Sequence, residues 1–277
     1  MDLVTHGLMG TMMAGLGLKG KFGAVSMVTM VIANIAPDLD IVAGLKGPKT
    51  FYKYHREVTH SLLGAFILWI LISGGIYLFT PLDSLLAIML MVGLGLARHL
   101  FMDSLTPWGL PLFYPFSSKK YGFDLIWFFD PAIISTMIGG VYLAYQYPAF
   151  EIMFYTGSFT LIGAYLVLRF TQKRRAEKIA EDGLSPRFKG AERFVLPSAV
   201  NPFMWDVIYT ARSQYLYVCV DTRRGEVLNT REFSSSPYHR CIKNSCQSDL
   251  VDVFLKRARF PFYCVTREEG CYTVEWN

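Results

Sequence analysis

Residues 55–79 read HREVTHSLLGAFILWILISGGIYLF, so a polar heptapeptide stands directly before a long apolar run. The run 61–79 contains no charged residue. It is about as long as the 20 or so residues that a helix needs to cross the hydrocarbon core of a bilayer. Ionisable groups at membrane depth cost free energy and usually serve a function. The stretch therefore predicts a membrane helix with a functional site at one end.

The composition indicates a membrane protein with a soluble tail. The 277 residues are 52% hydrophobic, and the mean hydropathy is +0.31, which soluble domains of this length rarely reach. Long apolar runs fill the first 170 residues, and most of the charge follows them. We expect a mainly α, polytopic membrane helix bundle at 1–171, a basic linker at 172–190 and a small cytoplasmic α+β domain at 191–277.

Further apolar runs predict more membrane helices. Runs of spanning length cover 84–105, 126–147 and 145–170, and the last two share a turn at 146–150. The first two runs, 4–18 and 22–36, are short and predict a tilted or re-entrant hairpin. The total is four to six spans.

Basic residues set the expected orientation. The run QKRRAEK at 172–178 follows the last span directly and predicts a cytoplasmic anchor, and not a nucleic-acid-binding segment. Counting back, the loops 37–60 and 106–125 are cytoplasmic, and the turns at 80–83 and 146–150 lie outside. Lys19 and Lys21 are a minor exception to this rule.

Histidines and aspartates gather at the cytoplasmic ends of these segments. His99 and Asp103 are four residues apart and share a helix face. Asp38 and Asp40 follow Pro37 and point the same way if the turn is extended. Imidazole and carboxylate together suit Zn, Mn or Fe, often in a two-metal site. The alternative for Asp2, Asp83 and Asp130 is that they cap helices. Four separate segments thus place six of these histidines and aspartates on one side of the membrane, namely His6, Asp38, Asp40, His60, His99 and Asp103.

The ordered motifs carry a resemblance to a known family. In chain order they are THGLMG (5–10), PDLD (37–40), HREVTHS (55–61), HLFMDSLTPWG (99–109) and YPFS (114–117). This series resembles the bacterial membrane-bound metal-dependent hydrolases, the YdjM-like inner-membrane proteins, over about residues 1–170.

The resemblance implies an inner-membrane location and a bound divalent metal, with the six candidate ligands holding one ion or two. It also implies that His55 and Arg56 lie around the metal or face the substrate. Asp38, His55, Arg56 and Arg98 are the predicted catalytic residues.

The predicted reaction is hydrolysis of an ester or phosphoester by a metal-bound water. Because the site lies at the membrane face, we expect a lipid or lipid-linked substrate, a lipid environment and no nucleic acid. The sequence contains no Gly-x-Ser-x-Gly elbow and no P-loop, so a serine hydrolase or a nucleoside triphosphatase lacks support. Two alternatives stay open: an ion or proton transporter or channel, and a membrane-tethered interaction protein.

The tail predicts a small domain without a catalytic motif. Residues 213–233 predict a β-hairpin turning at Arg224-Gly225, and 262–276 predict a second turning at Glu269-Gly270. Residues 248–262 predict a short amphipathic helix. His239 is expected in an exposed loop. The five cysteines, all after residue 218, have spacings that fit a zinc site or a disulfide framework poorly.

Overall fold

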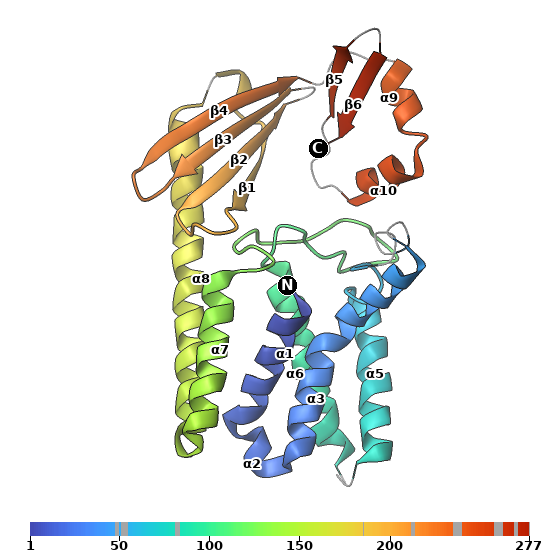
Figure 1. The fold of residues 1–277 in the computed structure, drawn as a ribbon, viewed down its shortest axis with the longest axis vertical. Coiled ribbons are helices and arrows are strands. Elements are labelled where there is room, and N and C mark those ends of the chain that lie inside the picture. Colours follow the sequence, from blue (N-terminus) through green and yellow to red (C-terminus); the bar gives the residue numbers. More distant parts are fainter. Residues whose placement is uncertain are drawn as a thin grey trace. The chain divides into compact units, whose positions relative to one another are not determined.

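The computed structural model describes most of the chain, in two compact units (Figure 1). One unit comprises Met1–Val42 and Tyr54–Phe170, and the other comprises Ala43–Lys53 and Thr171–Asn277. The described residues are 1–47, 50, 55–80, 84–184, 186–211, 214–234, 240–257, 263–268 and 271–276.

The first unit is a bundle of helices (Figure 1). α8 runs on past Phe170 into the second unit. The long helices are α1 (Leu3–Met13), α3 (Ala24–Ile35), α5 (Leu62–Phe79), α6 (Leu85–Ser104), α7 (Pro131–Gln146) and α8 (Glu151–Asp182). Shorter turns join them, namely η1 (Ala14–Leu18), α2 (Lys19–Phe22), η2 (Ala36–Lys46) and η3 (Pro148–Phe150).

Four helical stretches are long and apolar enough to cross a membrane. They are Ala24–Val42, Leu62–Phe79, Leu85–Ser104 and Pro148–Asp182. Only 11% of the Leu62–Phe79 window is buried inside the bundle, so most of its apolar side chains face outward, as they do towards lipid. The prediction of a polytopic helix bundle is therefore confirmed.

One expected span is shorter than the sequence predicted. The apolar run begins near residue 126, but α7 starts only at Pro131 and has 16 residues. The Asp130 side chain accepts hydrogen bonds from the amides of Ala132 and Ile133, and Pro131 takes the first helical position, where its missing N–H costs nothing. Residues 126–130 therefore belong to the preceding loop. Conversely, the run expected to be too short extends through η2 to give the candidate span Ala24–Val42.

The N-terminal helices form the expected hairpin. A kink at Leu16 and Gly17, where Gly17 has φ 115°, reverses the chain between α1 and α3. α3 then packs closely against α6. The absence of a side chain at Gly95 of α6 permits this approach, since a Cβ there would lie 2.6 Å from the Ala33 Cβ. This close approach sets the spacing of the elements that carry the site.

The helix-cap interpretation is confirmed for two aspartates. Asp2 caps α1 by accepting from the Thr5 amide, and Asp130 caps α7. Asp83 and the expected outer turn around it lie outside the described residues. The turn at 146–150 is present, since α7 ends at Gln146 and Pro148 opens the next helical turn.

A long loop, residues 105–130, joins α6 to α7 and is fastened to the bundle. The Phe123 amide donates to the Ser104 carbonyl at 2.7 Å, and the Leu62 amide donates to the Leu112 carbonyl at 2.9 Å. These bonds attach the loop to the last turn of α6 and the first turn of α5.

The second unit contains a four-stranded antiparallel sheet in the order β1-β2-β3-β4. One face packs on the end of α8 through Ala176 and Ala180, with Trp205 fully buried between them and the strands. The β3–β4 hairpin turns at residues 221–225, as predicted. The strands are β1 (Glu192–Pro197), β2 (Met204–Ala211), β3 (Gln214–Asp221) and β4 (Glu226–Ser234).

The rest of this unit follows the sequence expectation. The amphipathic stretch forms α10 (Asp249–Arg257), preceded by α9 (Arg240–Ser245). β5 (Tyr263–Glu268) and β6 (Cys271–Trp276) pair in antiparallel register. The turn at Glu269-Gly270 and the loop residue His239 lie outside the described residues.

Candidate metal centre

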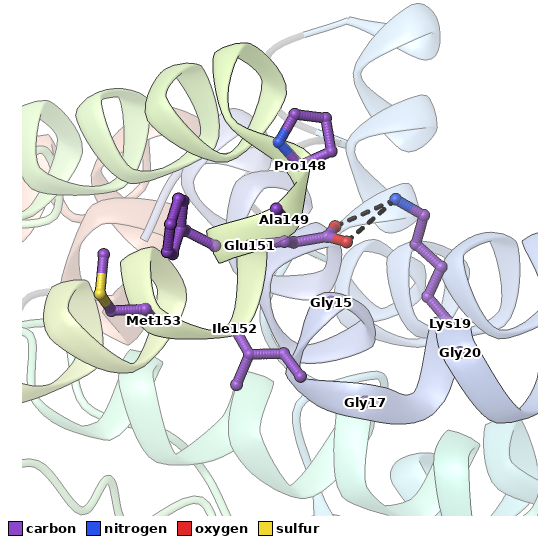
Figure 2. Close-up of a pocket in the computed structure, with 10 residues that line it drawn as sticks. Gly15, Gly17, Lys19, Gly20, Pro148, Ala149, Glu151, Ile152 and Met153 are labelled. Carbon is purple, nitrogen blue, oxygen red and sulfur yellow. Dashed lines mark hydrogen bonds and ion pairs between the residues drawn. The ribbon is translucent and has the colours of Figure 1, made fainter.

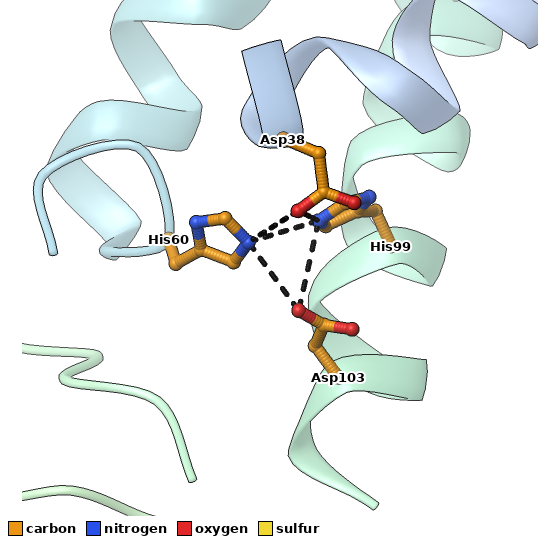
Figure 3. A group of neighbouring side chains, drawn as sticks. All are labelled: Asp38, His60, His99 and Asp103. Atoms are coloured by element: carbon orange, nitrogen blue, oxygen red, sulfur yellow. Dashed lines mark hydrogen bonds and ion pairs between the residues drawn. The ribbon is translucent and has the colours of Figure 1, made fainter. Parts of the chain in front are cut away.

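Three segments bring four predicted ligands together at one end of the first unit (Figure 3). Asp38 comes from η2, His60 from the loop before α5, and His99 and Asp103 from successive turns of α6. One ligand atom from each residue lies within 4.8 Å of all the others. The side chains of both histidines and of Asp103 are fully buried, and that of Asp38 is 7% exposed. We call these four residues the ligand group.

The spacing of the ligand atoms suits a small divalent ion. His60 Nε2 lies 3.2 Å from His99 Nε2, 3.2 Å from Asp38 Oδ1 and 3.3 Å from Asp103 Oδ2. His99 Nε2 lies 3.8 and 3.9 Å from the same two oxygens. Tetrahedral ligands at zinc bond lengths are about 3.3 Å apart. The group is therefore already close to coordination geometry.

A backbone carbonyl fixes the tautomer of His99. Its Nδ1 lies 2.6 Å from the Asn34 carbonyl oxygen, which can only accept a hydrogen bond. Nδ1 of His99 therefore carries the proton, and Nε2 presents a lone pair to the centre of the group. Metal-binding histidines are usually oriented by such a bond at the other ring nitrogen.

His60 is oriented in the same sense by Thr59. The Thr59 hydroxyl donates to Asp40 Oδ2 at 2.7 Å, so its oxygen accepts from His60 Nδ1 at 3.0 Å. Nε2 of His60 then also faces inward. Two nitrogen lone pairs and two carboxylates converge, an arrangement that is repulsive without a positive charge between them.

The carboxylate of Asp38 supports the same conclusion. Among the residues that the structure describes, neither Asp38 oxygen accepts a hydrogen bond, although both are buried. Buried carboxylates without donors are costly unless a cation neutralises them. Burial alone would lower the pKa of His60, but Asp103 and Asp38 outweigh burial and raise it. The position therefore favours positive charge, which a metal ion would supply.

His6 lies beside the ligand group and faces the other carboxylate oxygens. Its ring stacks on that of His99 with centroids 3.9 Å apart. Its Nε2 lies 3.1 Å from Asp103 Oδ1 and 3.8 Å from Asp38 Oδ2. The Met1 amino group also contacts Asp103 Oδ1. His6, a predicted ligand, is thus not one of the four residues of the ligand group but lies next to both of its aspartates.

Asp40 occupies a different place from Asp38. The expectation that both point the same way was wrong, because residues 36–46 form a 3₁₀ helix and not an extended turn, so positions two apart diverge. Asp40 accepts from His55 Nδ1 at 2.6 Å, from the Arg56 amide at 2.8 Å and from the Thr59 hydroxyl at 2.7 Å. Asp40 thus bonds the 55–60 loop on the side away from the ligand group, and its Oδ2 lies 3.7 Å from His60 Nδ1.

Arg56 adds positive charge next to the ligand group. Its backbone has φ 60°, which is uncommon for a residue with a side chain, and the Asp40 bond to its amide holds this conformation. Its Nη2 lies 2.9 Å from Asp103 Oδ2 and 3.1 Å from the Met1 carbonyl oxygen. Its buried Nε makes no hydrogen bond to any described residue.

Asn34 is the site residue that the sequence analysis missed. Its carbonyl orients His99, its Oδ1 accepts from Arg98 Nη1 at 2.7 Å, and its Nδ2 donates to the Met30 carbonyl at 2.8 Å. Arg98, predicted as catalytic, therefore bonds the residue that orients a ligand. The available signal was a lone amide in the otherwise apolar stretch 30–36.

Gly64 allows the 55–60 loop to fold back on α5. A Cβ at this position would lie 1.9 Å from the Val58 carbonyl oxygen. Ser61 caps the helix by accepting from the Gly64 amide at 3.0 Å. The loop is therefore pressed against the first turn of α5, and this contact sets the position of His60.

A hollow of about 490 Å³ lies at the other end of α1 and shares no residue with the ligand group (Figure 2). It is lined by the α1–α3 turn and the start of α8, where Lys19 Nζ lies 3.0 Å from Glu151 Oε1. Both side chains are partly exposed.

Fold and site together define a polytopic helical membrane protein with a buried His/Asp group that could hold a metal ion. The chain belongs to the YdjM inner membrane protein family, whose family model matches residues 1–176. The match confirms the resemblance seen in the motifs and ends within α8, before the sheet. Comparisons with curated proteins and with solved structures found no match.

Proposed function

We propose that the chain is a membrane-bound metal-dependent hydrolase that acts on a lipid or lipid-linked phosphoester at the cytoplasmic face of the inner membrane. The observation that carries this proposal is the convergence of two inward-facing imidazole nitrogens with two buried carboxylates. A Zn, Mn or Fe ion bound there would lower the pKa of a bound water and polarise an ester oxygen.

The four residues of the ligand group differ in side-chain exposure, and this difference suggests different roles. Four protein ligands close a tetrahedral zinc site, whereas a catalytic site keeps one position open. Asp38 has the most exposed side chain of the four, at 7%, and accepts no hydrogen bond from the residues that the structure describes. We assign Asp38 as the carboxylate that would take the proton of the attacking water, while His60, His99 and Asp103 would hold the ion. His6 would hold a second ion if two are bound.

His55 is assigned to the substrate side. Its side chain is 19% exposed, more than that of either Asp40 or Asp38. The bond from its Nδ1 to Asp40 is 2.6 Å long and orients the ring as a carboxylate orients a catalytic histidine. His55 would donate a proton to the leaving oxygen at the mouth of the site.

Arg56 and Arg98 receive different roles. Arg56 stands 2.9 Å from Asp103 and has a buried, unsatisfied Nε, so its guanidinium would bind a phosphoryl oxygen and stabilise developing charge. Arg98, bonded to Asn34, acts as a positioning residue for His99 and does not touch the substrate.

The position of the centre favours a membrane substrate over ion conduction. His60 stands two residues before α5, and Asp103 lies in the last turn of α6, both candidate spans. Among the described residues of the first unit, the fully buried histidines all lie within 4 Å of the fully buried Asp103 and are not spread along the bundle. A transporter would need such groups staggered through the membrane depth.

The test uses the full chain purified in detergent. Metal content is measured by elemental analysis, and phosphate release is measured from phosphatidic acid and from a polyprenyl phosphate. We expect bound metal and turnover in the wild type, neither in His60→Ala, and metal without turnover in His55→Gln. Turnover that survives His60→Ala would overturn the proposal, and so would a folded wild type that binds no metal. If the function belonged to the C-terminal tail alone, the His60→Ala variant would keep that function.

A further inference from the structure

The loop 105–130 exposes an unusual set of aromatic side chains. Their exposed fractions run from 37% for Tyr121 to 89% for Phe116. Large exposed apolar patches mark surfaces that meet another molecule or a membrane. The set consists of Trp108, Phe113, Phe116, Tyr121, Phe123, Phe128 and Phe129. We call it the aromatic loop.

The aromatic loop is held in this exposed form by its own backbone. Leu110 and Tyr121 exchange two amide–carbonyl hydrogen bonds, at 2.8 and 2.9 Å. Gly109, with φ 62°, makes the turn beside this bridge. The bridge closes the backbone of residues 110–121, the part of the loop that carries Phe113 and Phe116.

The loop stands at the ends of two candidate spans. The Leu62 amide, at the start of α5, donates to Leu112, and the Phe123 amide donates to Ser104 at the end of α6. Where apolar helices end, the membrane passes from hydrocarbon to headgroups, and aromatic rings are enriched at that level. The aromatic patch thus continues the lipid-facing surface of the helices.

The charge of the loop matches an anionic surface. Lys119 is exposed, and its Nζ stands 5.6 Å from the centre of the Tyr121 ring. Lys120 follows it, and the only acidic residues from 105 to 130 are Asp124 and Asp130, both buried. Aromatic rings interleaved with lysine suit the boundary between acyl chains and anionic headgroups.

We propose that the aromatic loop seats in the headgroup layer of the surrounding membrane, with Phe116 inserted among the lipids and Lys119 bound to an anionic phospholipid headgroup. This inference is independent of the reaction at the ligand group. It assigns the loop as the surface through which this end of the bundle contacts lipid.

Photocrosslinking in the full-length protein tests the insertion. The chain is reconstituted in vesicles of phosphatidylcholine and phosphatidylglycerol, with p-benzoylphenylalanine replacing one residue at a time. Phe116 is the test position, and Phe79, equally exposed at the far end of α5, is the lipid-facing control. Val200, 81% exposed in the second unit, is the matched exposed position outside the spans.

We expect phospholipid adducts from positions 116 and 79 and none from 200. Adducts from position 116 to residues of the second unit would overturn the proposal, because that unit would then cover the loop. Absence of any adduct at 116, with adducts present at 79, would also overturn it.

A second measurement tests the anionic contact. With the crosslinker at 116, Lys119→Gln should lower the ratio of phosphatidylglycerol to phosphatidylcholine adducts about fivefold, the effect of one lysine near an anionic membrane. Lys119→Arg should keep the ratio, and so should the control Lys178→Gln, which removes one charge from α8 in the second unit. An unchanged ratio in Lys119→Gln would remove Lys119 from the proposal.

Discussion

The Nε2 atoms of His60 and His99 face one another 3.2 Å apart, and each ring is oriented from behind by an acceptor at Nδ1. His99 is held by a backbone carbonyl, and His60 is held by a threonine that a buried aspartate fixes. The acceptors at the two Nδ1 atoms come from different segments, but both orient the Nε2 atom of their histidine towards the same position. This pairing is the strongest structural reason to expect a metal ion in the chain.

Removing one imidazole should empty the site. His60→Ala deletes the ligand that lies closest to all three others, so the purified protein should lose its metal to background in elemental analysis. His55→Ala is the matched control, since His55 contacts Asp40 and lies outside the ligand group. Equal metal loss in both variants would mean that the whole 55–60 loop, and not His60 itself, decides binding.

Asn34 should matter for metal binding although it carries no ligand atom. In Asn34→Leu the part-buried Arg98 guanidinium loses its acceptor, next to the backbone carbonyl that orients His99. Loss of such outer partners typically lowers metal affinity by about 10–100-fold, measurable by competition with a chelating dye. Thr29→Val is the control in the same helix, because the buried Thr29 hydroxyl bonds to no described residue. Unchanged affinity in Asn34→Leu would contradict the positioning role.

Metal binding should weaken as the pH falls. The pKa of His60 is raised in the folded protein, so a proton occupies Nε2 at a higher pH than on an ordinary histidine. The metal must displace that proton, and the retained metal should therefore decline on acidification through the pKa of His60. Dialysis at a series of pH values followed by elemental analysis measures this. Metal retention that is flat down to the ordinary histidine range would show that the ion does not compete with this proton.

The contact between the 55–60 loop and α5 should be sensitive to a single methyl group. In Gly64→Ala the new Cβ would meet the Val58 carbonyl oxygen at 1.9 Å, so the loop must move. Overpacking of this kind usually costs about 1–3 kcal/mol and should lower the thermal unfolding midpoint. Gly74→Ala, later in the same helix, meets nothing within 4 Å and should be neutral or slightly stabilising.

Length and apolarity were enough to predict the bundle. α5 and α6 begin at Ser61 and Ser84 caps and end close to the predicted positions, because each is a long apolar run opened by a capping serine. α7 is shorter than its apolar run, because Asp130 and Pro131, which interrupt the run near its beginning, form the start of the helix. The strands β1 and β2 have no tight turn between them, so their pairing was not visible in the sequence.

The site was predictable where its geometry is local. His99 and Asp103 share a helix face, and this spacing alone placed them together. The different places of Asp38 and Asp40 depend on a 3₁₀ helix, and the role of Asn34 depends on the packing of α3 against α6. Such tertiary contacts leave no periodic signal in one sequence. The sequence therefore could not separate a ligand such as Asp38 from a residue such as Asp40, which bonds the 55–60 loop.

The 16 residues of α7 have a consequence for the membrane itself. A helix of that length measures about 24 Å, less than the roughly 30 Å of a typical hydrocarbon core. A bilayer meets a short helix by thinning, at a modest cost for each ångström of mismatch. Tyr142 and Tyr145 are exposed on this helix, so its outer flank does meet the surroundings. Because α7 is not among the four stretches of spanning length, a bilayer that it crosses must thin beside it, which would bring headgroups nearer to the bilayer midplane there than beside α5.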